Sequence, residues 1–189
     1  MMRLIYSILA MYCLSLPMTT AADNPSLTEL FHLRLVDRLD RPEDGYCFDI
    51  LGVGANLRVD LPLFAHNCKP VLTNDSAVRR LPGGQIEFPA VGGCVTVAGV
   101  NSRALPGASF LVRRCDERGA FFETAALQRF ELREDGRLVL AGTGLCVSVG
   151  ARSDSTYSTQ DRWRALFVED CDRIEASRSS WEFVVPGLD

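Results

Sequence analysis

The sequence feature that most restricts the fold is a frame of cysteines that repeats three times along the chain. An apolar, a polar and an apolar residue follow each first cysteine, at 48–50, 95–97 and 147–149 after Cys47, Cys94 and Cys146. An apolar segment precedes each second cysteine, at 63–65, 110–112 and 166–168 before Cys68, Cys115 and Cys171. The separations within the pairs are 21, 21 and 25 residues. Among the pairings that six thiols allow, this repeat selects disulfides Cys47–Cys68, Cys94–Cys115 and Cys146–Cys171.

The first 22 residues have the pattern of a secretory signal peptide. Arg3 gives a basic start, residues 4–16 are apolar, and residues 20–22 are small, as a cleavage site requires. The apolar stretch of 13 residues is too short to cross about 30 Å of hydrocarbon, and no later segment approaches the length of a membrane span. We therefore predict a secreted or periplasmic protein with no membrane span, in which the six remaining cysteines form disulfides.

Short segments of alternating hydrophobicity surround each cysteine pair, which is typical of half-buried strands. They lie before the first cysteines and after the second ones, at 31–35, 85–88 and 137–140, and at 76–78, 128–130 and 179–181. Gly83-Gly84 and Asp135-Gly136 lie between repeats, where tight turns need a positive φ. With the segments at the cysteines, each repeat has four strands. Three propeller blades are too few to close a ring, so we predict an all-β fold, a β-trefoil.

These features resemble the ricin B-type lectin β-trefoils, whose repeat has a cysteine, an apolar-Asp-apolar triplet, a second cysteine and a Gln-x-Trp signature. Residues 128–130 look like the signature with Phe for Trp, and residues 179–181 keep the Trp but lose the Gln. The first repeat keeps neither residue at 76–78. The resemblance covers residues 30–187, after an N-terminal extension at 23–29. It implies that the signature residues support the core and the turns.

The resemblance implies a sugar site in repeat one, the repeat that contains Cys47 and Cys68. Asp49 holds the place of the carboxylate that accepts hydrogen bonds from two adjacent hydroxyls. His66 holds the place of the aromatic stacking face, Asp75 is a second acceptor and Asn74 a donor. Two carboxylates in one small site would repel each other. The alternative interpretation is that Asp49 caps a turn and His66 is a half-buried strand residue.

Repeats two and three lack the residues that this kind of site needs. Thr96 and Ser148 stand where repeat one has Asp49, and a hydroxyl is a weaker acceptor than a carboxylate. Arg113 and Glu169 occupy the position of the aromatic face. We therefore expect at most one degenerate sugar site, in repeat one.

Long loops in repeats two and three are further candidates for binding, because loops on a rigid scaffold commonly carry function. Residues 151–164 are expected to form a polar, flexible loop with two aromatic residues, Tyr157 and Trp163. Both types are good anchors for a protein or a glycan. The alternative for Trp163 is that it begins the strand leading to residues 166–168 and packs on the barrel.

The residue content argues against catalysis and against nucleic-acid binding. A net charge of −4 gives no basic excess for nucleic acid. The sequence contains no Cys-x-x-Cys spacing, and neither a phosphate loop nor a serine elbow surrounds the two histidines, His32 and His66. We therefore predict a protein that is not an enzyme and binds no cofactor or metal. We interpret the chain as a carbohydrate-binding module with a glycan or glycoprotein partner. The alternative is a non-catalytic protein-interaction trefoil, such as the binding subunit of a secreted toxin or surface assembly, with a protein partner subunit.

Overall fold

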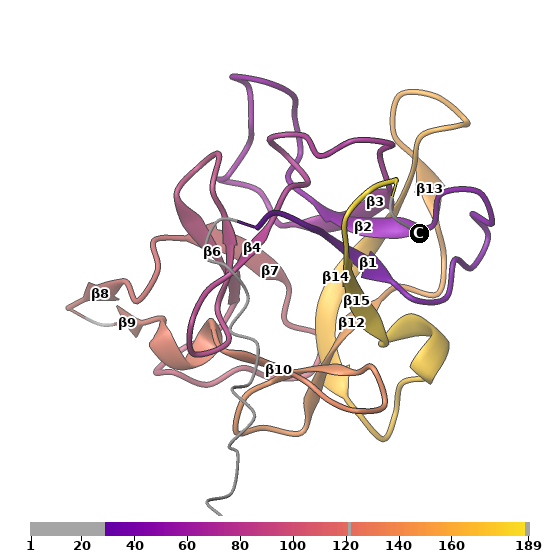
Figure 1. Cartoon of the computed structure of the whole chain (residues 1–189). Coiled ribbons are helices and arrows are strands. Elements are labelled where there is room, and N and C mark those ends of the chain that lie inside the picture. Colours follow the sequence, from indigo (N-terminus) through magenta and orange to yellow (C-terminus); the bar gives the residue numbers. More distant parts are fainter. Residues whose placement is uncertain (1–28, 121, 188–189) are drawn as a thin grey trace, which may run out of the picture.

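The chain forms short strands and little helix in the part that the computed structural model describes, residues 29–120 and 122–187 (Figure 1). Repeat one contains β1 (His32–Leu35), β2 (Tyr46–Asp49), β3 (Phe64–Asn67) and β4 (Arg79–Arg80). Repeat two contains β5 (Ile86–Phe88), β6 (Gly93–Val97), β7 (Phe110–Arg113), β8 (Arg118–Gly119), β9 (Phe122–Glu123) and β10 (Phe130–Leu132). Repeat three contains β11 (Leu138–Leu140), β12 (Leu145–Val149), β13 (Asp154–Ser155), β14 (Arg162–Asp170) and β15 (Trp181–Val184). Two short 3-10 helices, Ala125–Leu127 and Ala176–Arg178, precede β10 and β15.

The predicted signal peptide, residues 1–22, lies outside the described residues, and so do residues 23–28 of the predicted extension. Neither 3-10 helix in the described part of the chain is long or apolar enough to cross a membrane.

Antiparallel pairing follows the same order in each third of the chain. The second and third strands of a repeat form a hairpin, in β2–β3, β6–β7 and β12–β14. The last strand of one repeat pairs with the first strand of the next, β4 with β5, β10 with β11, and β15 with β1. The β1–β15 ladder runs from His32 opposite Val184 to Leu35 opposite Trp181, so the third repeat closes on the first (Figure 1). This arrangement confirms the predicted all-β fold, a β-trefoil.

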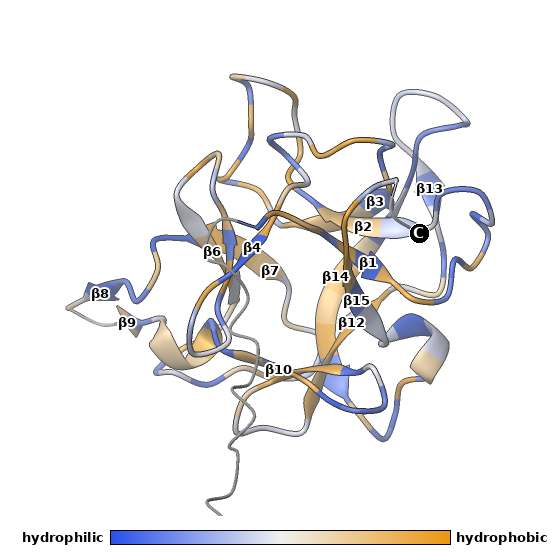
Figure 2. Ribbon diagram, viewed as in Figure 1, coloured by the Kyte–Doolittle hydropathy of each residue, from blue (hydrophilic) through white to orange (hydrophobic). Residues whose placement is uncertain are grey.

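The core is built around large side chains that the three repeats point inward. Phe48 of β2 packs edge-to-face against Trp181 of β15 and Phe110 of β7, with ring centroids 4.9 Å and 5.8 Å away. Val95 and Val147, which hold the position of Phe48 in the other two repeats, are fully buried. Figure 2 shows apolar stretches along β7 and β14, and polar stretches at β8 and β13. The core therefore forms where the alternating segments of the sequence meet.

Each of the three hairpins is closed by one disulfide, with the pairing that the sequence frame predicts. Cys47 is bonded to Cys68, and the Cα atoms are 5.0 Å apart. The bonds Cys94–Cys115 and Cys146–Cys171 join Cα atoms 5.1 Å and 5.0 Å apart. Three disulfides in one chain of this size are typical of an oxidising environment.

The signature residues support the core. The side chain of Gln128 is fully buried, and its amide nitrogen donates to Thr96 Oγ1 and to the carbonyl of Arg114, both at 2.9 Å. The indole N–H of Trp181 donates to the carbonyl of Val147 at 2.8 Å. These two residues satisfy polar groups inside the trefoil, where water cannot do so.

Glycines make the turns between repeats, as the sequence predicts. Gly83 and Gly84 have φ of +82° and +85°, and Gly136 has φ of +81°. A Cβ on Gly84 would lie 2.4 Å from the carbonyl oxygen of Phe130. The positive φ and the close backbone both require glycine at this position.

Candidate functional site

One face of the sheet formed by β2, β3 and β14 brings together residues of repeats one and three. Asp49 of β2 lies opposite Phe64 of β3, and Phe64 lies opposite Ala165 of β14. Two positions further along β3, His66 lies opposite Trp163 of β14. Residues directly opposite each other in an antiparallel ladder share one face of the sheet. The register therefore joins the predicted Asp49 site to Trp163, which the sequence places in a separate loop.

This face points away from the core, because the alternate residues Phe48 and Ala65 are fully buried inside. The ring of Phe64 meets His66 edge-on at a centroid distance of 5.8 Å and meets Trp163 edge-on at 6.3 Å. Each of these three side chains is half-buried. They form a row of rings, which we call the aromatic row: Phe64, His66 and Trp163.

Lys69 links the two predicted carboxylates at the other end of the face. Its Nζ donates to Asp49 Oδ2 at 2.8 Å and to Asp75 Oδ2 at 2.6 Å. Thr73 Oγ1 donates to Asp75 Oδ1 at 2.5 Å. Asp49 and Asp75 are only 3% and 5% exposed, whereas a quarter of the Lys69 side chain is exposed, at 25%. The ammonium group offsets the repulsion between the carboxylates, and Lys69 is the most exposed of the three residues in this acid–lysine cluster.

The acid–lysine cluster titrates unevenly. Burial raises the pKa of Asp49 to about 7, although Lys69 opposes this effect. Burial also acts to raise the pKa of Asp75, but hydrogen bonds from Lys69 and Thr73 outweigh it and hold that pKa below its usual value. Burial acts to lower the pKa of Lys69, and the two carboxylates outweigh it and raise that pKa. Near neutral pH, Asp49 is therefore the member of the cluster that changes its charge.

His66 presents a neutral ring to this face. Burial, and then the charge of Lys69, lowers the pKa of the His66 imidazole. Its Nδ1 lies 3.3 Å from the carbonyl oxygen of Asn67. An uncharged imidazole held at its edge leaves its face for contact with an apolar surface.

Hydroxyl groups fix the segment that carries Asp75. Ser76 Oγ lies 3.2 Å from Nε2 of His32 and 2.8 Å from Thr73 Oγ1. Burial, and then the charge of Lys69, lowers the pKa of His32, so this imidazole is also neutral at neutral pH. The neighbouring Asn74 is exposed.

The predicted flexible loop at 151–164 is instead a hairpin of β13 and β14, with its turn at 156–161. Asp154 lies opposite Trp163, so Trp163 belongs to a strand, as the alternative interpretation of that residue held. The sequence pattern hides this because β14 extends for nine residues and pairs with β12 at one end and with β3 at the other. Those ladders satisfy backbone groups that a loop would expose to water.

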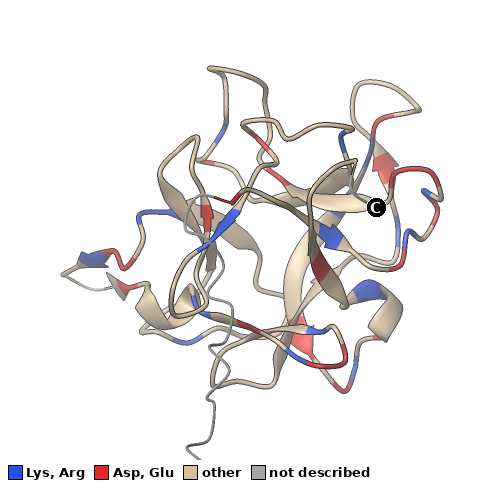
Figure 3. Ribbon diagram, viewed as in Figure 1, with Lys and Arg blue, Asp and Glu red and all other residues tan. Residues whose placement is uncertain are grey.

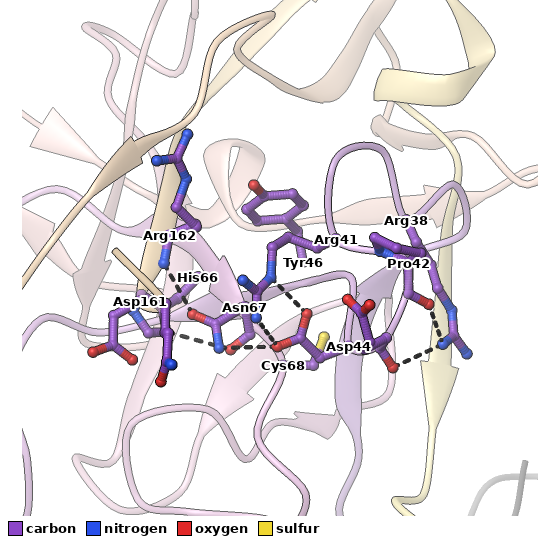
Figure 4. A network of polar contacts seen from close by, with 12 residues as sticks. Arg38, Arg41, Pro42, Asp44, Tyr46, His66, Asn67, Cys68, Asp161 and Arg162 are labelled. Carbon is purple, nitrogen blue, oxygen red and sulfur yellow. Dashed lines mark hydrogen bonds and ion pairs between the residues drawn. The ribbon is translucent and has the colours of Figure 1, made fainter. Parts of the chain in front are cut away.

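Polar side chains hold this hairpin to repeat one, as Figure 4 shows. Asn67, at the end of β3, donates from Nδ2 to Asp44 at 3.1 Å and accepts the backbone N–H of Arg162 at its Oδ1 at 3.2 Å. Arg41 in turn donates from Nε to Asp44 at 2.8 Å. One asparagine thus connects the β1–β2 loop to the start of β14.

Asp40 makes a second connection between the β1–β2 loop and repeat three. Its carboxylate accepts hydrogen bonds from Tyr46 at 2.8 Å and from Ser153 and Arg164, each at 2.5 Å. The Arg164 side chain is 6% exposed, and its guanidinium lies 4.9 Å from the centroid of the Tyr46 ring. Burial acts to raise the pKa of Asp40, but hydrogen bonds from Arg164, Ser153 and Tyr46 outweigh it and hold that pKa well below its usual value. This cluster positions β14, and with it Trp163.

In the other two repeats, the residues at the position of Asp49 are buried and hydrogen-bonded to the backbone. Thr96 is 3% exposed, and its hydroxyl donates to the carbonyl two residues earlier at 2.9 Å. Ser148 is fully buried and makes the same bond at 3.1 Å. Arg113 and Glu169 occupy the aromatic position there, so neither repeat combines a carboxylate with a ring.

Charged residues of both signs are interspersed over the rest of the molecule, as Figure 3 shows. Many form surface pairs, such as Arg58 with Asp60 at 2.7 Å, where both side chains are more than half exposed, at 55% and 60%. Exposed pairs of this kind contribute little to stability. The acid–lysine cluster differs because both of its carboxylates are buried.

The residue that the sequence interpretation misses is Lys69. The sequence contains a single lysine, and this residue follows Cys68 directly, beside the predicted site. Its contribution depends on the reach of a flexible side chain, which spacing alone does not reveal. Tyr157, the other predicted loop contact, is 91% exposed in the hairpin turn and stays a prediction.

Solved structures with a similar fold include lectins. An agglutinin from Abrus precatorius matches with a TM-score of 0.55 and 19% identity, covering 82% of this chain and 48% of the agglutinin chain. A β-trefoil lectin of the Vibrio vulnificus hemolysin/cytolysin, solved with N-acetyl-D-lactosamine bound, matches with a TM-score of 0.50 and 14% identity, covering 85% and 96%. The solution structure of an mdaA-1 domain matches with a TM-score of 0.57 and 16% identity, covering 85% and 91%.

No protein-family model matches the sequence, and no curated protein matches it either. This chain spans about half the length of the agglutinin chain. At these identities the similarity defines the fold, and the molecule is a β-trefoil of the kind found in those lectins.

Proposed function

We propose that this protein is an exported carbohydrate-binding module, with its glycan site on the outer face of β2, β3 and β14. The observation that carries the proposal is the strand register. It places Trp163 opposite His66 and places Asp49 opposite Phe64, all on one face of the sheet. Carbohydrate recognition combines polar groups that exchange hydrogen bonds with hydroxyls and aromatic rings that contact the apolar face of the sugar. This face offers both.

The acid–lysine cluster supplies the polar part of the proposed site. Two of the three N–H groups of Lys69 are directed to Asp49 and Asp75, which leaves one for the oxygen of a ligand hydroxyl. The carboxylates behind it hold the ammonium in place, so the lysine does not lose rotamer freedom when a ligand binds. Lys69 is therefore the proposed first contact for the sugar, and Asp49 and Asp75 hold its position.

The aromatic row supplies the apolar part. Repeat one has an imidazole where the lectin-type repeat has its aromatic face, and an imidazole is a smaller ring than an indole. Trp163 makes up for this because β14 carries it next to His66. Three disulfides and the lectin folds of the similar structures also support an exported glycan-binding protein.

A glycan array, followed by calorimetry on the best glycan, tests this proposal with the oxidised protein. Asp49→Asn and Trp163→Ala should each weaken binding by about tenfold or more, because the first removes the charge that holds Lys69 and the second removes a stacking ring. Ser148→Ala changes the position equivalent to Asp49 in repeat three and should leave the affinity within about twofold. All variants should first show a cooperative thermal transition.

The pH dependence gives a second readout of the same site. Because the pKa of Asp49 is about 7, acidification from pH 8 to 5 removes the charge that holds Lys69, and glycan affinity should fall. The Asp49→Asn variant should lose this dependence. Glycan binding that survives both Asp49→Asn and Trp163→Ala would place the site elsewhere and overturn the proposal.

A second candidate, a protein-interaction trefoil, is favoured by one observation. Tyr157 is 91% exposed at the turn of the β13–β14 hairpin, and exposed tyrosines are common anchors of protein interfaces. The same array separates the two candidates. A cooperatively folded protein that retains no glycan, and that loses a protein ligand through Tyr157→Ala, would favour this second function.

A further inference from the structure

An apolar pocket of about 510 Å3 lies beside the proposed glycan site. The β2–β3 connection of repeat one forms one wall with Leu51 and Leu61, and the β13–β14 hairpin forms the other with Tyr157 and Trp163. Its volume falls within the range of pockets that bind small molecules. We call this space the apolar pocket.

The lining of the apolar pocket carries no charge. Nine of its residues are hydrophobic or aromatic, and the other two are the hydroxyl residues Ser109 and Thr156. A carboxylate, a phosphate or an ammonium group would lose its hydration here without gaining a partner. A sugar ring would leave most of its hydroxyls unsatisfied for the same reason. The occupant that suits this lining is neutral and consists mainly of hydrocarbon.

The apolar pocket and the proposed glycan site share two residues. Phe64 and Trp163 belong to the aromatic row and also line the pocket. Ala165, which stands opposite Phe64 on the same face, is exposed and also lines the pocket. Because the side chain of Ala165 is small, it leaves space between the two walls of the pocket. A group attached to a sugar on the aromatic row would therefore enter the pocket without crossing a polar surface.

We propose that the apolar pocket binds a hydrocarbon group linked to the sugar, so that the protein recognises the amphipathic junction of a glycolipid or alkyl glycoside. This inference rests on the proposed function, because it assigns the substituent next to the glycan of that site. The exposed Tyr157 stands at the rim, where its ring is available to cover the hydrocarbon.

The test uses methyl, butyl, hexyl and octyl β-D-galactosides below their micelle concentrations, with 1-hexanol as the sugar-free probe. Binding is followed by tryptophan emission, to which Trp163 responds, whereas Trp181 is buried in the core at 1% exposure. The affinity should rise about fourfold for each added methylene until the pocket is filled. Ala165→Phe fills the pocket from an exposed position and should abolish the dependence of affinity on chain length.

The outcomes separate this inference from the proposed function. Galactosides that bind with no dependence on chain length, in the protein and in Ala165→Phe alike, overturn the inference and leave the glycan site standing. Equal affinity for 1-hexanol and hexyl galactoside, unchanged by Asp49→Asn, overturns the link between pocket and sugar, and the glycan array then decides the proposed function separately. If Ala165→Phe unfolds, Leu61→Gln provides the second test, since it adds a polar amide to the half-buried wall and should reduce the chain-length dependence.

Discussion

Repeats one and two use the same place in the trefoil for different purposes. In repeat two, the amide nitrogen of Gln128 donates a hydrogen bond to Thr96. Gln128 is neutral, and its side chain is fully buried. In repeat one, the place of Thr96 is taken by Asp49, and the charged Lys69 reaches over it from the end of the hairpin. Both hairpins carry a disulfide with a sequence separation of 21 residues. The scaffold is thus the same, and only the polar residues differ.

The two buried polar groups differ in how much they contribute to the stability of the fold. A neutral buried amide with all its partners stabilises the fold. A buried ion pair adds little net stability, because the desolvation of its charges offsets their attraction. Repeat two therefore has the residues of a scaffold, whereas the buried ion pair of repeat one adds little to stability and fits the binding role proposed above.

The largest expected effect comes from the feature that the two repeats share. In the chain-entropy model each disulfide contributes roughly 3 kcal/mol, so reduction of all three should unfold the protein or lower its melting temperature strongly. Because the separations are both 21 residues, the double variants Cys47→Ser/Cys68→Ser and Cys94→Ser/Cys115→Ser should lose similar amounts. Urea unfolding with and without reductant measures this. A melting temperature that reductant does not change would contradict the pairings.

A smaller effect should distinguish the scaffold residue from its counterpart in repeat one. Gln128→Ala leaves several buried groups without partners and should cost about 3 kcal/mol. Ser76→Ala changes the matching position of repeat one and should cost about 1 kcal/mol, because it removes the weaker contacts to Thr73 and His32. Urea unfolding of both variants at one pH gives the comparison. An equal loss of unfolding free energy in the two variants would contradict this difference between repeat one and repeat two.

The last comparison is a dependence of stability on pH that the Asp49 carboxyl group of repeat one provides. Asp49 has a pKa of about 7 in the folded chain and about 4 when unfolded, so between these values the folded state holds a proton that the unfolded state has lost. Stability should therefore rise as the pH falls from 8 to 5, by about 2 kcal/mol more than in Asp49→Asn. Urea unfolding at the two pH values measures the difference. Ser148→Ala, the matched variant of repeat three, should behave like the unchanged protein.

The fold could be predicted from sequence because its signals are local and repeated. Each cysteine pair lies within 25 residues, and the alternation around it marks strands without reference to the rest of the chain. The site could be predicted only in part. Asp49 and Asp75 follow from their places in the repeat, but the contact of Lys69 with both depends on side-chain reach.

The position of Trp163 beside His66 could not be predicted, because it depends on pairing between strands that are distant in the sequence. A polar composition at 151–164 suggests a loop, yet the backbone there pairs with β3 and the side chains of Asp40 and Asn67 hold it. Tertiary contacts of this kind override the local preference of the segment.

The pairing of β1 with β15 has a consequence for how the chain matures. Each disulfide joins residues of one hairpin, so a repeat is able to acquire its covalent link before the following repeats have folded. The edge of β1 stays unpaired until β15 has followed it, because contacts of such long sequence separation form late. During that interval the emerging protein is cross-linked but open, with a bare strand edge that other chains can join. Pairing of β15 with β1 removes this exposed edge from the folded protein.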